Sequence, residues 1–232
     1  MKNLNIFSLV TEYENAKSGG VLNVPNVSFV DEDSSVRYLL KNIDPYNGHE
    51  YVDLGLSVKW ATCNVGATSP EQAGLYFAWG ETTGYTAEQV NSGVREFSSS
   101  VYNSGPAASI SADLTLEQDA AHVNLGGNWR MPTKAEYQEL IDNCKVVWTN
   151  NYNGTGIKGR IFTSKINSNS VFFPAAGICD DSSVNYVGSW GYYWSASYSP
   201  NNAGISLFFT SSVQSLGAYG KDIGRVVRAV CE

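Results

Sequence analysis

Residues 127–137 read GNWRMPTKAEY, and they decide the fold because they begin a helix with one clearly apolar face. Pro132 suits the start of a helix, and Thr133 with Glu136 forms a capping box, in which each side chain accepts a backbone N–H of the other residue. The apolar residues that follow have the spacing of a single helix face. They are Tyr137, Leu140, Ile141 and Cys144. We therefore predict a helix that packs this stripe against the core.

A shorter helix is predicted just upstream, over residues 119–123. Thr115 with Gln118 forms a capping box before it, and Gly126-Gly127 marks its carboxyl end. His122 lies on this helix without a nucleophile motif nearby. We therefore expect a structural, hydrogen-bonded histidine rather than a catalytic one.

Short strands surround the two predicted helices. Apolar and alternating runs separated by turn residues predict strands within residues 51–61, 76–79, 146–149, 159–164 and 170–174. Residues 82–113 are rich in Ser, Gly, Ala and Asn, so we expect a long surface excursion there. Short strands around two helices make the fold class α+β.

The first part of the chain differs from the rest. Residues 1–46 read as an extended arm or hairpin, ended by the turn signal Pro45-Tyr46-Asn47-Gly48, and residues 47–232 read as one domain. An arm this short cannot cover both of its own faces, so we expect it to pack on the domain or on another copy, giving a homo-oligomer such as a trimer. Its first residues do not have the pattern of a signal peptide.

Composition excludes several classes of function. The net charge is -7 and no cluster of Lys and Arg exists, which argues against a nucleic-acid partner. No run approaches the ~20 apolar residues that span a bilayer, so we expect no membrane insertion. The four cysteines lack a CxxC pair, which argues against zinc. Their even number would allow disulfides in an oxidising compartment, but we expect mostly buried free thiols. We expect no metal and no cofactor.

Catalytic motifs are also missing from the sequence. It holds no G-x-S-x-G, no H-E-x-x-H, no phosphate-binding glycine loop and no EF-hand loop. The acidic runs 31–33 and 180–181 have the pattern of solvated turns. Glu81 and Glu136 could pair as a general acid and base, but structural roles explain both more simply. We therefore predict that the protein is not an enzyme.

The strip from 189 to 224 has the composition of a binding surface. It holds eight aromatic residues, eight serines, five glycines and two asparagines against two charges, Lys221 and Asp222. Aromatic rings supply rigid contact area, and small polar residues supply adaptable hydrogen bonds. The alternative is a core strand pair with polar turns. Leu207 and Phe209 alternate with polar or outward residues, so one face of that strand should be buried.

Several motifs resemble known families. Residues 127–137 resemble the W-R-[LM]-P-T-x-A-E-[WY] signature of C-type-lectin-fold proteins related to formylglycine-generating enzymes. A domain repeated in Bacteroidetes and related gut bacteria is similar from about Gly48 to the end, through residues 51–61, 76–81, 173–177, 191–197 and 227–230. Within that set, the chain resembles the variable proteins of diversity-generating retroelements, in which mutagenic reverse transcription directed at adenines rewrites codons of a C-terminal strip.

The resemblance implies a C-type lectin fold, with two helices and short twisted antiparallel sheets, that displays a variable strip over residues 190–224. The displayed, ligand-binding set that it implies is Tyr192, Tyr198, Asn201, Asn202, Gly204, Ser206, Phe208, Leu216, Ala218, Tyr219 and Asp222. The scaffold set is Trp194, Ser195, Leu207, Phe209, Val213, Val227 and Val230. Varied residues must face solvent, because core substitutions cost several kcal/mol.

The function implied is recognition of a host cell-surface protein or glycan by a phage tail, with the N-terminal arm attaching it to the virion. One alternative is a lectin-like adhesin that is secreted or held on the bacterial surface. A second is an enzyme of the formylglycine-generating type, although Cys179 and Cys231 do not match its reactive pair. The calcium-dependent sugar motifs E-P-N, Q-P-D and W-N-D are missing, so we expect ligand binding to survive EDTA.

Overall fold

The computed structural model describes residues 46–232, and the chain divides between Gly48 and His49. The predicted arm therefore lies outside the described residues, except for its last residue, Tyr46. Asn47 and Gly48 both have positive φ, 48° and 74°, as an Asn-Gly turn requires. Homo-oligomerisation and attachment through the arm stay predictions.

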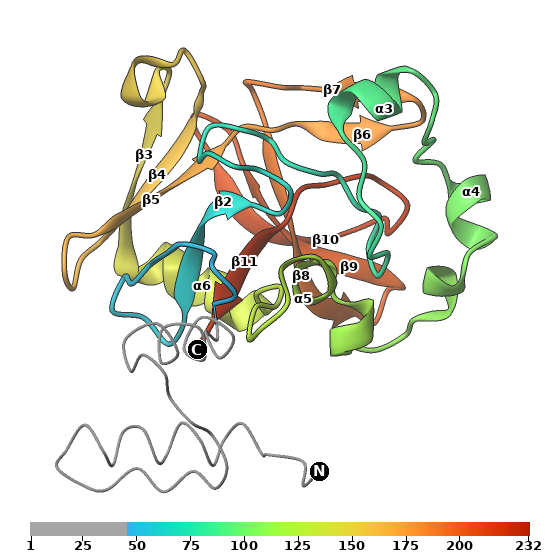
Figure 1. The fold of residues 1–232 in the computed structure, drawn as a ribbon, viewed down its shortest axis with the longest axis horizontal. Coiled ribbons are helices and arrows are strands. Elements are labelled where there is room, and N and C mark those ends of the chain that lie inside the picture. The colour runs from blue at the N-terminus through green and yellow to red at the C-terminus, as the bar shows by residue number, and fades with distance from the viewer. Residues whose placement is uncertain (1–45) are drawn as a thin grey trace, which may run out of the picture. The chain divides into compact units, whose positions relative to one another are not determined.

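Along the described residues two strands come first, then the four α-helices, and then nine strands (Figure 1). The α-helices are α3 (Ala87–Asn91), α4 (Ser99–Asn103), α5 (Ala120–Leu125) and α6 (Lys134–Asn143). Three 3-10 turns are η1 (Pro106–Ser109), η2 (Leu116–Gln118) and η3 (Tyr152–Gly154). The strands are β1 (Tyr51–Val52), β2 (Lys59–Asn64), β3 (Cys144–Thr149), β4 (Gly159–Ser164), β5 (Ser170–Pro174), β6 (Ile178–Asp180), β7 (Ser183–Asn185), β8 (Gly191–Ser199), β9 (Ala203–Phe209), β10 (Gln214–Tyr219) and β11 (Arg228–Cys231).

The strands form small antiparallel sheets, ordered β1-β2-β11, β10-β9-β8, β3-β4-β5 and β6-β7. The α+β class is confirmed. The predicted strand pair at 51–61 is present, with Tyr51 opposite Ala61. The predicted strands at 146–149, 159–164 and 170–174 form the β3-β4-β5 sheet. Residues 76–79 are buried as predicted, but Tyr76 and Phe77 make only isolated bridges.

Helix α6 begins as its sequence predicts. The Thr133 hydroxyl accepts the Glu136 N–H at 3.2 Å, and the Glu136 carboxylate accepts the Thr133 N–H at 2.7 Å. The same carboxylate binds the Arg130 guanidinium at 2.6 and 2.9 Å. Burial raises the pKa of Glu136, but the bonds from Arg130 and Thr133 outweigh burial and lower it. Tyr137 and Leu140 are fully buried, so the predicted stripe faces the core.

Helix α5 begins later than its predicted cap. The box of Thr115 and Gln118 exists, but it precedes the η2 turn, and Asp119 is the N-cap of α5. The buried Asp119 carboxylate accepts backbone N–H groups of Ala121 at 2.8 Å and Met131 at 2.7 Å. His122 Nδ1 lies 3.0 Å from the Trp129 carbonyl oxygen, which confirms a hydrogen-bonded histidine.

The prediction of a surface excursion over residues 82–113 is wrong. This segment contains α3, α4 and η1, and it buries Val90, Phe97, Tyr102 and Ala107. The Tyr102 hydroxyl donates to the carbonyl oxygens of Trp79 at 2.7 Å and Ala107 at 3.0 Å. A few well-spaced apolar side chains anchor the segment, although its average composition is polar.

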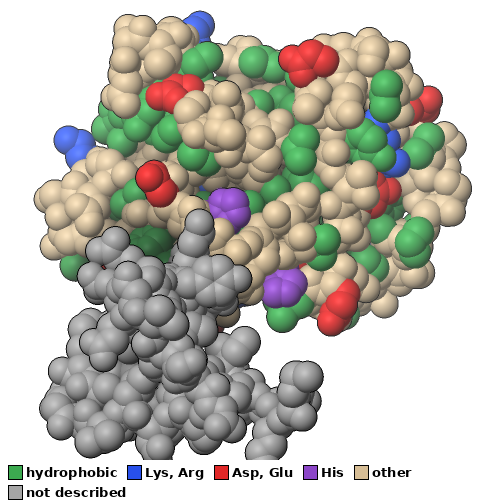
Figure 2. All heavy atoms as spheres, in the orientation of Figure 1, with side chains coloured by type: hydrophobic (Ala, Val, Ile, Leu, Met, Phe, Trp, Pro, Cys, Tyr) green, Lys and Arg blue, Asp and Glu red, His purple; other side chains and the backbone are tan. Residues whose placement is uncertain are grey.

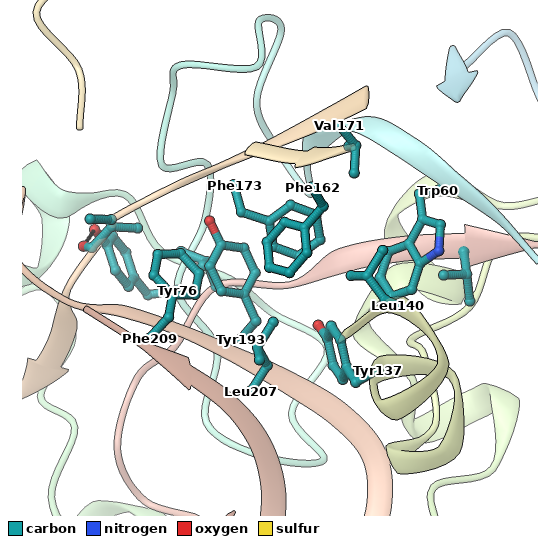
Figure 3. Close-up of a cluster of buried hydrophobic side chains, with 14 of the residues drawn as sticks. Trp60, Tyr76, Tyr137, Leu140, Phe162, Val171, Phe173, Tyr193, Leu207 and Phe209 are labelled. Carbon is teal, nitrogen blue, oxygen red and sulfur yellow. Dashed lines mark hydrogen bonds between the residues drawn. The ribbon is translucent and has the colours of Figure 1, made fainter. Parts of the chain in front are cut away.

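Aromatic rings fill the core between α6 and the strands (Figure 3). The Phe173 ring lies 5.0 Å from Phe162, 4.8 Å from Tyr193 and 5.8 Å from Trp60, between ring centroids. The Tyr193 hydroxyl donates to the Pro174 carbonyl at 2.6 Å. This core contact fixes strand β8 to the β3-β4-β5 sheet, and it therefore fixes the position of the β10-β9-β8 sheet that carries most of the predicted strip.

Candidate ligand-binding surface

The β10-β9-β8 sheet has one face against the core and one face outward. Its register places Tyr193 opposite Leu207 on the inner face and Tyr192 opposite Phe208 on the outer face. The inner residues Tyr193, Leu207 and Phe209 are fully buried, whereas Tyr192 and Phe208 are half-buried. The alternation predicted around Leu207 and Phe209 is therefore confirmed.

Five aromatic rings adjoin one another outside the core and make what we call the aromatic patch: Tyr186, Trp190, Tyr192, Phe208 and Tyr219. Centroids are 3.6 Å apart for Tyr186 and Trp190, 6.1 Å for Trp190 and Phe208, 4.6 Å for Tyr192 and Phe208, and 5.3 Å for Tyr192 and Tyr219. All five are at least partly exposed, and Tyr186 is 51% exposed. Contiguous exposed rings on a rigid sheet are suited to ligand contact.

Two members of the patch, Tyr186 and Trp190, are not in the predicted ligand-binding set. Tyr186 precedes the strip, in a turn where its φ is 62°, a conformation uncommon for a residue with a bulky side chain. Its carbonyl accepts the Trp190 N–H at 3.0 Å, which stacks the two rings. The turn signal Val187-Gly188 could have marked Tyr186 as exposed, but its stacking on Trp190 depends on the tertiary structure.

Other predicted residues lie away from the patch. Asn201 and Asn202 are exposed in the turn between β8 and β9, where Asn202 has a φ of 55°. Tyr198 is half-buried, with its ring 5.9 Å from Trp79. Asp222 accepts a hydrogen bond from the Ser99 hydroxyl. These four predicted residues therefore do not join the patch.

Two residues of the predicted set are buried, so their assignment to the displayed surface is wrong. The Ser206 side chain is fully buried, and its hydroxyl donates to the Tyr193 carbonyl at 2.8 Å. Gly204 is buried as well, and a Cβ there would lie 2.6 Å from the Trp79 ring. Trp194 and Trp79 cover this end of the outer face, so alternation alone could not separate it from the exposed end.

Two assignments on β10 and the turn before it also change, and a third residue, Ala218, is exposed as predicted but on the other face of the sheet. Leu216 pairs with Leu207 and Ala218 with Ile205, so both lie on the opposite face from the patch. Leu216 packs against the core, which corrects its assignment to the displayed set, whereas Ala218 is exposed because β10 is an edge strand. Val213 was assigned to the scaffold, yet it is 52% exposed.

The buried guanidinium of Arg225 lies beneath the aromatic patch, in contact with its rings. Its Cζ lies 4.5 Å from the Tyr192 ring centroid and 4.2 Å from those of Trp194 and Tyr219. Burial lowers the pKa of Arg225 to about 9, and nearby Tyr192, Tyr219 and Asp222 oppose that effect. Burial also raises the pKa of Tyr192 to about 12. Arg225 is therefore charged at neutral pH, and Tyr192 is neutral.

The carboxylates weighed as an acid and base pair are each engaged elsewhere. Glu81 binds Arg95 at 2.7 Å, whereas Glu136 binds Arg130. Glu81 and Arg95 line a cavity of about 410 Å³ beside η1 and η2. Each carboxylate has a structural ion pair of its own.

The surface is sparsely charged on the face in Figure 2, where apolar side chains form small separate patches. Among residues 46–232, no group of three side chains could hold a metal ion, and no helix is long and apolar enough to cross a membrane. All four cysteines are free thiols; three are buried and Cys63 is partly exposed.

Comparison of the chain with protein-family models, with curated proteins and with solved structures finds no match.

Proposed function

We propose that the protein is a non-enzymatic receptor-binding protein that recognises a host cell-surface protein or glycan through the aromatic patch. The observation that carries the proposal is the continuous set of five at least partly exposed rings on and beside a sheet whose other face buries Tyr193, Leu207 and Phe209 in the core. Large rings on a rigid support bind with little loss of side-chain entropy.

The finer proposal is a C-type lectin fold that displays a strip rewritten by a diversity-generating retroelement, on a phage tail. What supports it is the motif order along the sequence and the exposure of most of the implied positions. Tyr192, Asn201, Asn202, Phe208 and Tyr219 are all at least partly exposed, so changes there cost the fold little.

A binding assay on intact cells tests the function. Labelled full-length protein is titrated onto a panel of gut Bacteroidetes, and Tyr192→Ala and Phe208→Ala are compared with wild type. We expect each variant to weaken binding by about tenfold, because central aromatic residues dominate interfaces. The matched controls are Val123→Ala and Val147→Ala, which shorten exposed apolar side chains elsewhere. Equal losses in controls and patch variants, with all folds intact by circular dichroism, would contradict the proposal.

The genomic neighbourhood tests the retroelement origin separately. We expect a near-copy of codons 190–224, differing almost only at adenines, beside a reverse transcriptase gene. The differences should fall on codons for exposed residues and spare those for Leu207 and Phe209. If no such copy exists, the bacterial adhesin, which would use the same patch, is the better reading.

A further inference from the structure

Arg225 is held in a fixed place under the aromatic patch. Its side chain belongs to a residue that is only 3% exposed. Its backbone N–H and carbonyl both bond to Phe77, each at 2.9 Å. The rings of Tyr192, Trp194 and Tyr219 surround the Arg225 guanidinium, and we call these three rings the box. The Trp194 indole donates to the Phe77 carbonyl at 2.9 Å. The guanidinium and the Trp194 ring are therefore both anchored to the same segment.

Two nitrogens of this guanidinium, Nε and Nη1, are buried without a hydrogen-bond partner. The other buried arginines of the described chain differ. Arg228 donates to Asn64 and three carbonyl groups, and Arg160 donates to Gln214 and two carbonyl groups. Buried donors in proteins are nearly always paired, so the unpaired pair on Arg225 calls for a ligand group. Nε–H and Nη1–H lie on different edges of the guanidinium, so each can donate one charge-assisted hydrogen bond to a carboxylate oxygen.

Tyr219 is the part of the box best placed to open. It ends the edge strand β10, and its side chain is partly exposed, whereas Trp194 is fully buried. A Cβ built on Gly217 would lie 2.8 Å from the Tyr219 ring, so the ring lies over a glycine and not over a packed side chain. Gly220 follows directly. A rotation of the Tyr219 side chain outward would uncover one side of the guanidinium without moving the core.

We propose that Arg225 is an anion subsite of the aromatic patch, which takes a carboxylate of the ligand when the Tyr219 ring turns outward. The inference deepens the proposed function and rests on it, because it assigns a charge to the ligand that the patch binds. The carboxylate can belong to an acidic sugar or to an Asp or Glu side chain, and in both cases the rings of Tyr192 and Phe208 pack against the apolar part of the ligand next to it.

Nuclear magnetic resonance on the full chain tests this directly. The Arg225 Nε–H signal is assigned through its contacts with the rings of Tyr192 and Trp194, and acetate is added. We expect acetate to shift this signal and neutral acetamide to leave it in place. Glucuronate and N-acetyl-aspartate amide then distinguish the sugar source from the peptide source, and the stronger of the two identifies the ligand class.

Variants of Tyr219, whose ring covers the guanidinium, complete the test. Tyr219→Ala should bind acetate about tenfold more tightly, because the guanidinium loses a covering ring. Tyr219→Phe keeps the covering ring and should lack this gain, whereas Val213→Ala, an exposed apolar control beside β10, should bind acetate like wild type. Equal shifts with acetate and acetamide, no shift at all, or no gain in Tyr219→Ala would overturn the proposal. Loss of cell binding in Phe208→Ala together with no acetate shift would refute the subsite alone and leave the receptor-binding function standing.

Discussion

The two faces of the β10-β9-β8 sheet come from the same strands and carry the same kinds of side chain, yet they differ in what covers them. Tyr193 and Phe209 on the inner face are enclosed by the core, and Tyr193 stacks on Phe209 with centroids 5.8 Å apart. Tyr192 and Phe208 on the outer face contact each other and remain partly exposed. Aromatic composition therefore does not identify a binding surface, whereas the covering layer does.

The largest expected change in stability comes from a substitution on the inner face of the sheet. Leu207→Ala should lower the free energy of unfolding by about 3 kcal/mol, because it removes a fully buried side chain and leaves a cavity. Phe208→Ala, one residue away, should cost about 1 kcal/mol or less. Urea unfolding of both variants measures the difference. Equal losses would mean that the two faces are not distinct in energy.

A second variant tests the closed end of the outer face. Gly204→Ala should cost about 2 kcal/mol, because its Cβ would overlap the Trp79 ring at 2.6 Å and the Trp194 ring at 2.9 Å. Asn201→Ala, in the adjacent exposed turn, should change stability by less than about 0.5 kcal/mol. Thermal unfolding compares them. A neutral Gly204→Ala would place this position back in the displayed set.

Alkaline pH should lower the free energy of unfolding through the buried tyrosines. Burial raises the pKa of Tyr76, Tyr137 and Tyr193 above the ordinary value of 10.0, so above that pH the unfolded chain loses protons that the folded chain retains. Stability should then fall by about 1.4 kcal/mol per pH unit for each such tyrosine. Urea midpoints measured at successive pH values give the slope.

Arg225 works in the opposite direction over a lower pH range. Burial lowers the pKa of Arg225 in the folded state to about 9, well below its ordinary value in the unfolded chain, so the folded state releases its proton first as pH rises. This contribution raises stability above pH 9, whereas burial raises the pKa of the Cys144 and Cys179 thiols and so lowers stability over the same range. In a Cys144→Ala, Cys179→Ala variant, stability should therefore rise slightly between pH 9 and 10 before the tyrosines reverse the trend. A fall between pH 9 and 10 in that variant would contradict the assignment.

The smallest expected effect concerns Ser206. Ser206→Ala removes its hydrogen bond to the Tyr193 carbonyl and should cost about 1 kcal/mol. Ser215→Ala, an exposed serine on β10, should be neutral within about 0.5 kcal/mol. Equilibrium unfolding of the pair shows whether Ser206 is structural, as its burial indicates. Neutrality of both would argue that the bond contributes nothing.

Local signals in the sequence predicted much of the fold. The capping box of Thr133 and Glu136, the stripe through Tyr137 and Leu140, and the alternation around Leu207 each depend on neighbours in the chain, and each is confirmed. The segment 82–113 was predicted wrongly because its buried residues are few and widely spaced. Its core role depends on distant partners such as Trp79.

The candidate site was only partly predictable for the same reason. Composition and alternation predict Tyr192, Phe208 and Tyr219 as site residues. The addition of Tyr186 to this set was not predictable, because it depends on a turn that stacks the Tyr186 ring on Trp190. The set of rings around Arg225 has no sequence signature, because the rings come from β8 and β10, and Arg225 itself lies further along the chain.

By itself, the sequence determined where α6 begins, which residues alternate around Leu207, and that the last part of the chain is rich in rings and poor in charge. These properties depend on backbone hydrogen bonding and side-chain period, which act over a few residues. Only the tertiary structure decided which rings are covered, because Trp79 and Trp194 close one end of the outer face and leave the other end open. Burial depends on packing between segments far apart in the chain, and no local pattern encodes it.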